Sequence, residues 1–234
     1  MAIGGLVATM GIVVAAVYAV SAAKLSRRYV VEVPPLAIPD DATTVAAGQH
    51  LLTLAKCGEC HGDDLGGKVI IDEPLLGRIA GPNLTPAGVV AGYSDADWVR
   101  AIRHGVRPDG SPVFMMPSSE YAEITHSDLA DTIAYLAQLA PIERAVPESR
   151  PGMVGRKLVE SGSWEVGATL IDHTAPIPES AEDRGTYLAW ISGCVGCHAG
   201  GVGKGFGPGQ PPSSNLTPHE DGLAGWSLED FDAA

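Results

Sequence analysis

An uncharged, mostly apolar run opens the chain. Residues Ala2 to Ala23 contain no charged side chain, and as a helix these 22 residues would extend roughly 33 Å, enough to cross a bilayer. We therefore predict a transmembrane anchor over residues 1–24. A cleaved export signal is the alternative, because small residues end the run at Ser21 to Ala23. Three prolines between Val33 and Pro39 then predict a stiff, extended spacer over residues 25–42.

Helical patterns dominate residues 43–143. Val45 to Ala55 is predicted to form one helix, and Ser94 begins a second, which runs through Trp98. Ser127 and Asp128 are expected to cap a closing helix, whose buried stripe comprises apolar residues at helical spacing: Leu129, Ile133, Leu136 and Ala140. Glycine and proline between these segments indicate loops. The pattern predicts an all-α domain.

A second proline-rich stretch follows this domain. Five prolines between Pro141 and Pro178 interrupt any long helix, so residues 144–182 are predicted to form a linker, with some strand near Ala168 to Ile171.

The segments on either side of this linker repeat each other. Gly48 stands nine residues before Cys57, and Gly185 stands nine before Cys194. Asn83-Leu84-Thr85-Pro86 recurs as Asn215-Leu216-Thr217-Pro218. We therefore predict two all-α domains of one type, at residues 43–143 and 183–234. The second is expected to be incomplete, because Phe231 to Ala234 aligns with Trp98 to Ala101 and nothing matches the first domain's closing helix.

Composition limits the classes of partner and cofactor that the protein could bind. The net charge of −13 argues against nucleic-acid binding, which needs clustered Lys and Arg, and favours a basic protein partner. Only 6% of residues are aromatic, while the chain has 29 Gly and 18 Pro. In such loop-rich domains the side chains alone are not expected to fill the apolar core. A large bound cofactor would fill the remaining space.

All four cysteines fall in two Cys-x-x-Cys-His motifs. The first comprises Cys57, Cys60 and His61, and the second comprises Cys194, Cys197 and His198. Two thiols three residues apart lie on one side of a helical turn, where they can add to the two vinyl groups of a haem while the adjacent histidine binds the iron. Two disulfides do not explain why all four cysteines have this spacing. A zinc site would need two further Cys or His ligands at a suitable distance, and a thiol redox pair has no use for the adjacent histidine. We predict two covalently bound haem c groups as cofactors.

Methionine is expected to be the second axial ligand of the first haem. Only Met115 and Met116 lie in the first domain, and Met116, next to Pro117, is favoured, with Met115 packing in the core. His/Met ligation fills both axial positions, so this haem is predicted to transfer electrons and not to bind substrate.

Several further residues are read as supports of this haem. The carbonyl of Pro82, or one beside it, is expected to accept a proton from His61 Nδ1. Arg103 and Arg107 either face the haem propionates or are solvated surface charges. Trp98 is assigned to the core, and the histidines read as surface residues are His50, His104 and His126.

No methionine follows Met153, so the second haem has no evident sixth ligand. Four explanations remain open. The first is that the chain is an incomplete product, and the second is that the iron is five-coordinate. The third is that His219 binds the iron, and the fourth is that a partner supplies the ligand. An incomplete product is the favoured explanation, since loss of a closing helix would leave apolar surface uncovered.

Together these motifs resemble a known family. The series from Gly48 through Cys57, His61 and Asn83 to Met116 resembles the class I cytochrome c fold. More narrowly, the chain is similar to multihaem, membrane-anchored cytochrome subunits of periplasmic dehydrogenases and respiratory complexes. The resemblance covers residues 43–143 and the start of the second domain. It implies attachment of haem at the four cysteines, with His61, Met116 and His198 as axial ligands.

The predicted function is electron transfer between a donor enzyme or quinol-linked complex and a downstream acceptor, with no catalytic residues. Because haem is attached outside the cytoplasm, we expect a single-pass protein of the cytoplasmic membrane with both haem domains in the periplasm. Lys24, Arg27 and Arg28 follow the apolar run, and the positive-inside rule would keep them and the rest of the chain in the cytoplasm. We set this rule aside because of where haem is attached. The alternative function is a dihaem peroxidase that uses an open second iron. A gas sensor is less suitable, because no output domain is present.

Overall fold

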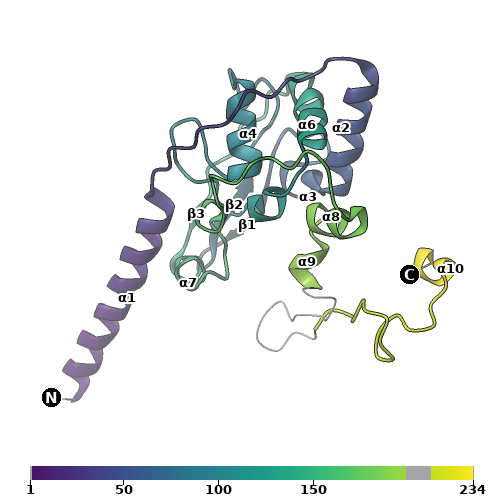
Figure 1. The fold of residues 1–234 in the computed structure, drawn as a ribbon. Coiled ribbons are helices and arrows are strands. Elements are labelled where there is room, and N and C mark those ends of the chain that lie inside the picture. The colour runs from purple at the N-terminus through teal and green to yellow at the C-terminus, as the bar shows by residue number, and fades with distance from the viewer. Residues whose placement is uncertain (1, 199–211, 234) are drawn as a thin grey trace. The chain divides into compact units, whose positions relative to one another are not determined.

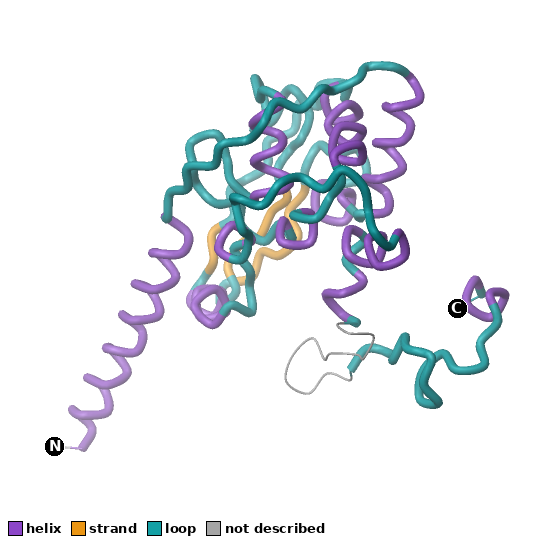
Figure 2. Tube along the Cα trace, in the orientation of Figure 1, coloured by secondary structure: helices purple, strands orange, loops and turns teal. Residues whose placement is uncertain are grey.

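The structure is a computed structural model that describes residues 2–198 and 212–233. The chain forms two compact units, residues 1–181 and residues 182–234, each of which is described by itself. Figures 1 and 2 show the elements of both units.

Helix α1 (Ala2–Ser26) extends away from the rest of the first unit (Figure 1). Its segment Gly4–Ser26 is long and apolar enough to cross a membrane, and only 6% of the most apolar window is buried within the protein. An anchor and a signal sequence share these properties. Val31 and Leu36, in the extended stretch after α1, are buried against the rest of the unit.

Five further helices build the core of the first unit: α2 (Ala42–Leu54), α3 (Cys57–His61), α4 (Asp95–His104), α5 (Ser118–Tyr121) and α6 (His126–Ala137). Leu129 and Ile133 of α6 are fully buried in this core, as the helical stripe predicts. Ala140, the last residue of the expected stripe, is exposed, because α6 ends at Ala137.

Side-chain caps determine where these helices begin. Ser94 and Asp97 form a reciprocal capping box at α4, which satisfies backbone N–H groups that the helix leaves free. The expected cap of α6 was wrong by two residues. Thr125, and not Ser127, accepts the Asp128 amide, because its extended backbone places the hydroxyl at the helix start.

The close approach of α2 to α6 depends on a glycine. Gly48 is buried, and a methyl group at its Cα would collide with the Asp131 carbonyl and press on the Tyr135 side chain. Two helices can approach this closely only where a residue without a Cβ faces the neighbouring backbone. Figures 1 and 2 show the two helices side by side.

A small antiparallel sheet departs from the expected all-α class, although most of the regular structure is helical. Strands β1 (Lys68–Glu73) and β2 (Gly77–Gly81) form a hairpin, and β3 (Arg150–Pro151) pairs with the start of β2. The run of β-branched residues Val69, Ile70 and Ile71 favours a strand over a helix.

The segment predicted to be an irregular linker contains regular structure. Helix α7 (Met153–Ser161) and the short 3-10 helix η1 (Gly167–Thr169) fall within it. The stretch between Pro151 and Pro176 contains no proline, which leaves room for a helix. The strand expected near Ala168 was wrong, since this residue lies in η1.

The second unit has three helices among its described residues: α8 (Arg184–Ile191), α9 (Cys194–Cys197) and α10 (Leu228–Asp232). Ser227 and Asp230 form a capping box at α10, which repeats the pair Ser94 and Asp97 of α4.

Candidate haem sites

Helix α3 carries the first Cys-x-x-Cys-His motif. Lys56 precedes it in a left-handed conformation, with φ of 52°, and this sharp turn redirects the chain from α2 into α3. Both thiols, on Cys57 and Cys60, are free. Burial raises the pKa of Cys57 to about 11, with a smaller contribution from Cys60, so the thiol is neutral at physiological pH.

The imidazole of His61 is held by a backbone carbonyl. Its Nδ1 donates to the Pro82 oxygen at 2.8 Å, as predicted, which leaves Nε2 as a free electron-pair donor. Burial lowers the pKa of His61, and the bond to Pro82 only partly opposes this. A neutral imidazole with a fixed tautomer is the form that binds iron.

The carbonyl of Pro82 is itself fixed by the residues around it. The buried Asn83 accepts from the amide and hydroxyl of Thr85 at 2.9 and 2.7 Å, and donates to the Ile142 carbonyl at 2.7 Å. Gly81 lies so close to α3 that a Cβ would collide with the Cys60 carbonyl. The strand β2 and the loop after it therefore set the orientation of His61.

The loop that carries Met115 and Met116, which we call the methionine loop, contacts the same core as α3. Cys57 and Met116 are both partly buried and pack against the main cluster of buried side chains. Met115 has a φ of 63°, which is unfavourable for a residue with a Cβ and marks a tight bend just before Met116. Sequence reasoning missed Tyr121, whose hydroxyl donates to the Ala55 carbonyl at 3.1 Å and so links α5 to the turn before Cys57.

Arg103 and His104 are buried, so the surface interpretation of both was wrong. Each is 2% exposed. The Arg103 guanidinium donates to the carbonyls of Ala175 and Pro176, and its Nε is buried without a partner. That free donor would suit an anionic group. Because His173 follows His104 by 69 residues, no local sequence signal could show that their rings meet, with the two Nδ1 atoms 3.2 Å apart.

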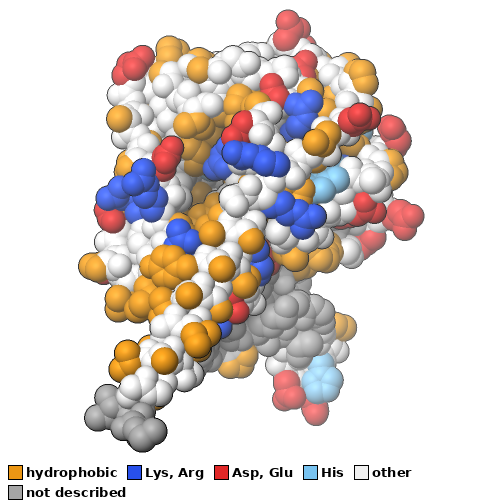
Figure 3. Space-filling model, turned by 90° about the vertical axis from the view of Figure 1, so that its left-hand side faces the viewer, with side chains coloured by type: hydrophobic (Ala, Val, Ile, Leu, Met, Phe, Trp, Pro, Cys, Tyr) orange, Lys and Arg blue, Asp and Glu red, His pale blue; other side chains and the backbone are white. Residues whose placement is uncertain are grey.

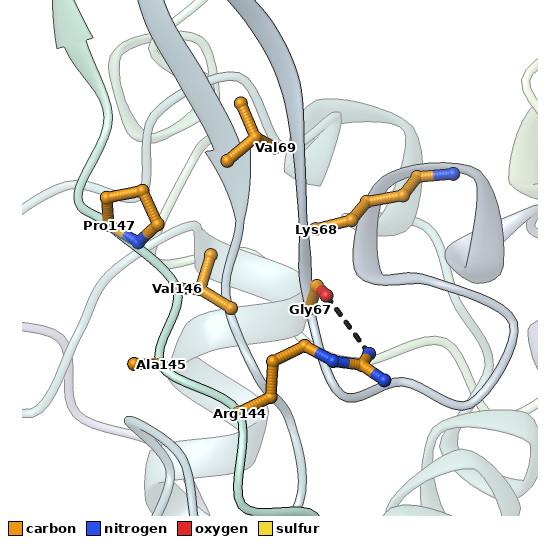
Figure 4. A pocket seen from close by; sticks show the side chains of 7 residues that line it. All are labelled: Gly67, Lys68, Val69, Arg144, Ala145, Val146 and Pro147. Carbon is orange, nitrogen blue, oxygen red and sulfur yellow. Dashed lines mark hydrogen bonds between the residues drawn. The ribbon is translucent and has the colours of Figure 1, made fainter.

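An ion pair between Arg144 and Asp64 fixes the loop that follows His61. Arg144 binds the Asp64 carboxylate through two nitrogens, at 2.8 and 2.7 Å. It also donates to the Gly67 carbonyl at 3.2 Å, as Figure 4 shows. The hydrogen bonds from Arg144 lower the pKa of Asp64 to about 2. A surface pocket beside this contact is lined by Gly67, Lys68, Val69, Arg144, Ala145, Val146 and Pro147.

The second motif repeats the local geometry of the first. His198 Nδ1 donates to the Ser214 carbonyl at 2.8 Å, and Asn215 accepts from the amide and hydroxyl of Thr217 at 2.9 and 2.7 Å. Gly193, with φ of 77°, occupies the position of Lys56 and enters α9 through the same left-handed turn. Cys194 and Cys197 are free thiols.

The second site is more open than the first. Cys194 is exposed, whereas Cys57 is partly buried. Among the residues that the structure describes, a Cβ at Gly185, the repeat position of Gly48, would have only Asp183 within 4 Å. Among the candidates for a sixth ligand, His219 is exposed and its Nδ1 accepts from the Asp221 amide at 3.2 Å.

These residues fit a covalently bound haem. Each motif offers two free thiols and one imidazole whose Nε2 is available, and the first site adds a nearby thioether. Within residues 2–198 and 212–233, no three Cys, His, Asp or Glu side chains gather in a way that would hold a metal ion on their own. The two thiols and one imidazole of each motif suit a metal that is delivered within its own macrocycle.

The first of these sites lies in a part of the chain that matches a known protein family. Residues 45–140 match the cytochrome c family. The cytochrome c subunit of a quinone alcohol dehydrogenase from Gluconacetobacter polyoxogenes is 30% identical over 178 residues, which cover 68% of this chain and 37% of that protein. The cytochrome c subunit of gluconate 2-dehydrogenase from Pantoea cypripedii is 29% identical, over 69% of this chain and 40% of its own length.

A third relative bears on the number of haems. A dihaem c-type cytochrome from Cereibacter sphaeroides is 28% identical over 68% of this chain and 58% of its own length. The chain thus spans well under two thirds of each of these relatives. Their names describe cytochromes, in agreement with an electron carrier and not with a peroxidase. Residues 45–140 are therefore a cytochrome c domain, and the chain is homologous to cytochrome c subunits of dehydrogenases.

Proposed function

We propose that this protein transfers single electrons through two covalently bound haem c groups, one in each unit. The observation that carries the proposal is the repeated histidine geometry. In both motifs Nδ1 is bound to a backbone carbonyl at 2.8 Å, and Nε2 remains free for iron. The dihaem relative supports the count of two.

In the first haem site, Cys57 and Cys60 would form the thioether bonds, and His61 and Met116 would bind the iron. The group would supply one-electron chemistry, and with both protein ligands in place it would bind no substrate. The protein's contribution is to hold these ligands fixed. Asn83 orients the Pro82 carbonyl that positions His61, and Tyr121 joins the methionine loop to the turn before Cys57.

In the second haem site, Cys194 and Cys197 form the attachment and His198 is the proximal ligand. The exposure of Cys194 and the open surroundings of Gly185 make this site more accessible to solvent. A more solvated haem generally has a different reduction potential from a buried one. The two haems are therefore proposed to differ in potential, which would give electron flow a direction.

The proposed organisation places both cytochrome c domains, residues 43–143 and 183–234, outside the cytoplasmic membrane. Helix α1 serves as a single-pass anchor, and residues 25–42 join it to the first domain. The names of the relatives support a dehydrogenase as electron donor. A quinol-linked complex is the other donor that we propose, with a further redox protein as acceptor.

A redox titration of the matured protein, solubilised in detergent, tests the electron-transfer proposal. The haem absorbance should follow two reversible one-electron steps. The double variant Cys57→Ala/Cys60→Ala should retain one step, and Cys194→Ala/Cys197→Ala should retain the other. The outcome against the proposal is haem absorbance that does not respond to potential, or rapid peroxide turnover with a reducing substrate.

A further inference from the structure

The end of the apolar helix α1 is fixed to helix α7. Lys24 Nζ donates to the carbonyls of Val159 and Glu160 at 3.1 and 2.9 Å, in the last turn of α7. A lysine at this position satisfies carbonyls that the helix leaves free and complements its dipole. Arg156 of α7 makes two further contacts with α1. Its guanidinium donates to the buried Ser21 hydroxyl at 3.2 Å and lies 4.8 Å from the centre of the Tyr18 ring.

This contact sets the depth of α7 relative to a bilayer. A hydrocarbon core about 30 Å thick is crossed by roughly 20 helical residues. The uncharged part of α1 ends at Ala23, and Lys24, the first charged residue after it, is the residue that contacts the last turn of α7. Helix α7 therefore lies beside the point where α1 would leave the membrane.

The surface around α7 has the composition of a membrane-facing element. Met153, Val154 and Leu75 are 49%, 37% and 59% exposed, and they adjoin because the Val154 amide donates to the Leu75 carbonyl at 2.9 Å. We call these three side chains the apolar patch. Figure 3 views this side of the protein, where apolar side chains gather beside α1.

Basic residues cluster near the same patch. Five of the chain's 15 Lys and Arg residues lie in or just after α1 and in α7: Lys24, Arg27, Arg28, Arg156 and Lys157. Arg28 pairs with Asp109 and Lys157 pairs with Glu160, which leaves Lys24, Arg27 and Arg156 as a local excess of positive charge in a protein with a net charge of −13. Figure 3 shows Lys and Arg side chains around the upper part of α1. Anionic lipid headgroups attract basic segments of this kind.

We propose that α7 and the β1–β2 turn lie on the bilayer surface, with the apolar patch among the lipids and the basic cluster at anionic headgroups. The inference rests on the proposed role of α1 as an anchor. The occupant is lipid because α7, which carries Met153 and Val154, packs against the end of the apolar helix α1, and because the adjacent charge is positive. The consequence is a second attachment point, which holds the first haem domain in one orientation on the membrane.

Spin labels on introduced cysteines test this contact in the full matured protein, reconstituted in vesicles of equal parts phosphatidylcholine and phosphatidylglycerol. Val154→Cys reports on the apolar patch, and Leu75→Cys is a second position if the first disturbs α7. Val89→Cys is the matched control, because Val89 is 62% exposed and lies outside the patch. Met10→Cys, within α1, reports on the anchor itself. The parent protein sets the labelling background.

At position 154 the label should collide readily with oxygen and poorly with a water-soluble nickel complex, at a depth of about 5–10 Å. The Val89 label should show the reverse. If position 154 behaves like position 89 while Met10 is in lipid, the patch proposal is wrong and the anchor stands. A label at 154 shielded from both reagents means protein covers the patch, which also overturns the proposal. If the Met10 label is exposed to water, the anchor and the inference both fail.

Discussion

His61 Nδ1 donates to the carbonyl oxygen of Pro82 at 2.8 Å, and this contact connects the haem-attachment helix to a buried loop 21 residues away. The same contact recurs between His198 and Ser214 in the second unit. In both units an asparagine follows the accepting residue and closes a turn on the threonine two residues later. In each unit the asparagine therefore fixes the loop whose carbonyl oxygen accepts the hydrogen bond from the histidine.

Replacement of that asparagine should affect the two units differently. Asn83→Ala removes a buried group that also donates to the Ile142 carbonyl, so we expect a loss of about 2–3 kcal/mol in unfolding free energy. Asn215→Ala, where the asparagine is only partly buried, should cost about 1 kcal/mol or less. Denaturant unfolding measures both. Equal losses would show that the Ile142 contact contributes nothing.

Glycine at the helix crossing provides a second matched pair. Gly48→Ala places a methyl group against the Asp131 carbonyl and should destabilise the first unit by about 2–3 kcal/mol. Gly185→Ala makes only ordinary van der Waals contact with the Asp183 carboxylate and should be neutral or stabilise α8 by up to about 1 kcal/mol. Thermal unfolding of each variant provides the test. A neutral Gly48→Ala would contradict the close approach of α2 and α6.

The two adjacent methionines can be separated by their effect on the first iron. Met116→Leu keeps the side-chain volume but removes the thioether, so the first haem should become high-spin and bind carbon monoxide. Met115→Leu should leave the spectrum unchanged. Optical and electron paramagnetic resonance spectra distinguish the spin states. The assignment is reversed if Met115→Leu is the variant that opens the iron.

The stability of the first unit should decrease in acid because of His104. Burial, and then the positive charges of Arg103 and His173, lower the pKa of His104 to about 4 from its ordinary value of 6.5. Between these values the unfolded chain binds a proton that the folded chain excludes, so stability is full above pH 6.5 and falls as pH drops towards 4. We expect a loss on the order of 2 kcal/mol.

A variant at the same position controls for other acidic groups. His104→Gln retains a polar side chain of similar reach but does not titrate, so its stability should change less between pH 6.5 and 4 than that of the parent. Urea unfolding at a series of pH values measures the difference. Parallel pH profiles for parent and variant would assign the acid sensitivity to another group.

Much of the first domain could be predicted from local sequence signals. The capping box of Ser94 and Asp97, the buried stripe of α6 and the carbonyl partner of His61 all depend on short motifs or helical spacing. The β1–β2 hairpin was missed although the β-branched run Val69 to Ile71 is a local strand signal. Its third strand had no local signal, because β3 joins the sheet from 69 or more residues further along the chain. No helical period or cap indicates such pairing.

The contacts made by the linker region were also beyond local reasoning. Lys24 meets the last turn of α7 across 135 residues, and His104 meets His173 across 69. Arg103 and His104 looked like surface residues because charged side chains are seldom buried alone. Their burial depends on partners from a segment whose prolines suggested irregular structure.

The most direct test of the account is the number of haems bound covalently to one polypeptide. Intact mass and pyridine haemochrome spectra of protein from a host that matures c-type cytochromes should give two for the parent. They should give one each for Cys57→Ala/Cys60→Ala and Cys194→Ala/Cys197→Ala. A single haem in the parent would contradict the second site, and a parent polypeptide without covalent haem would contradict the whole account.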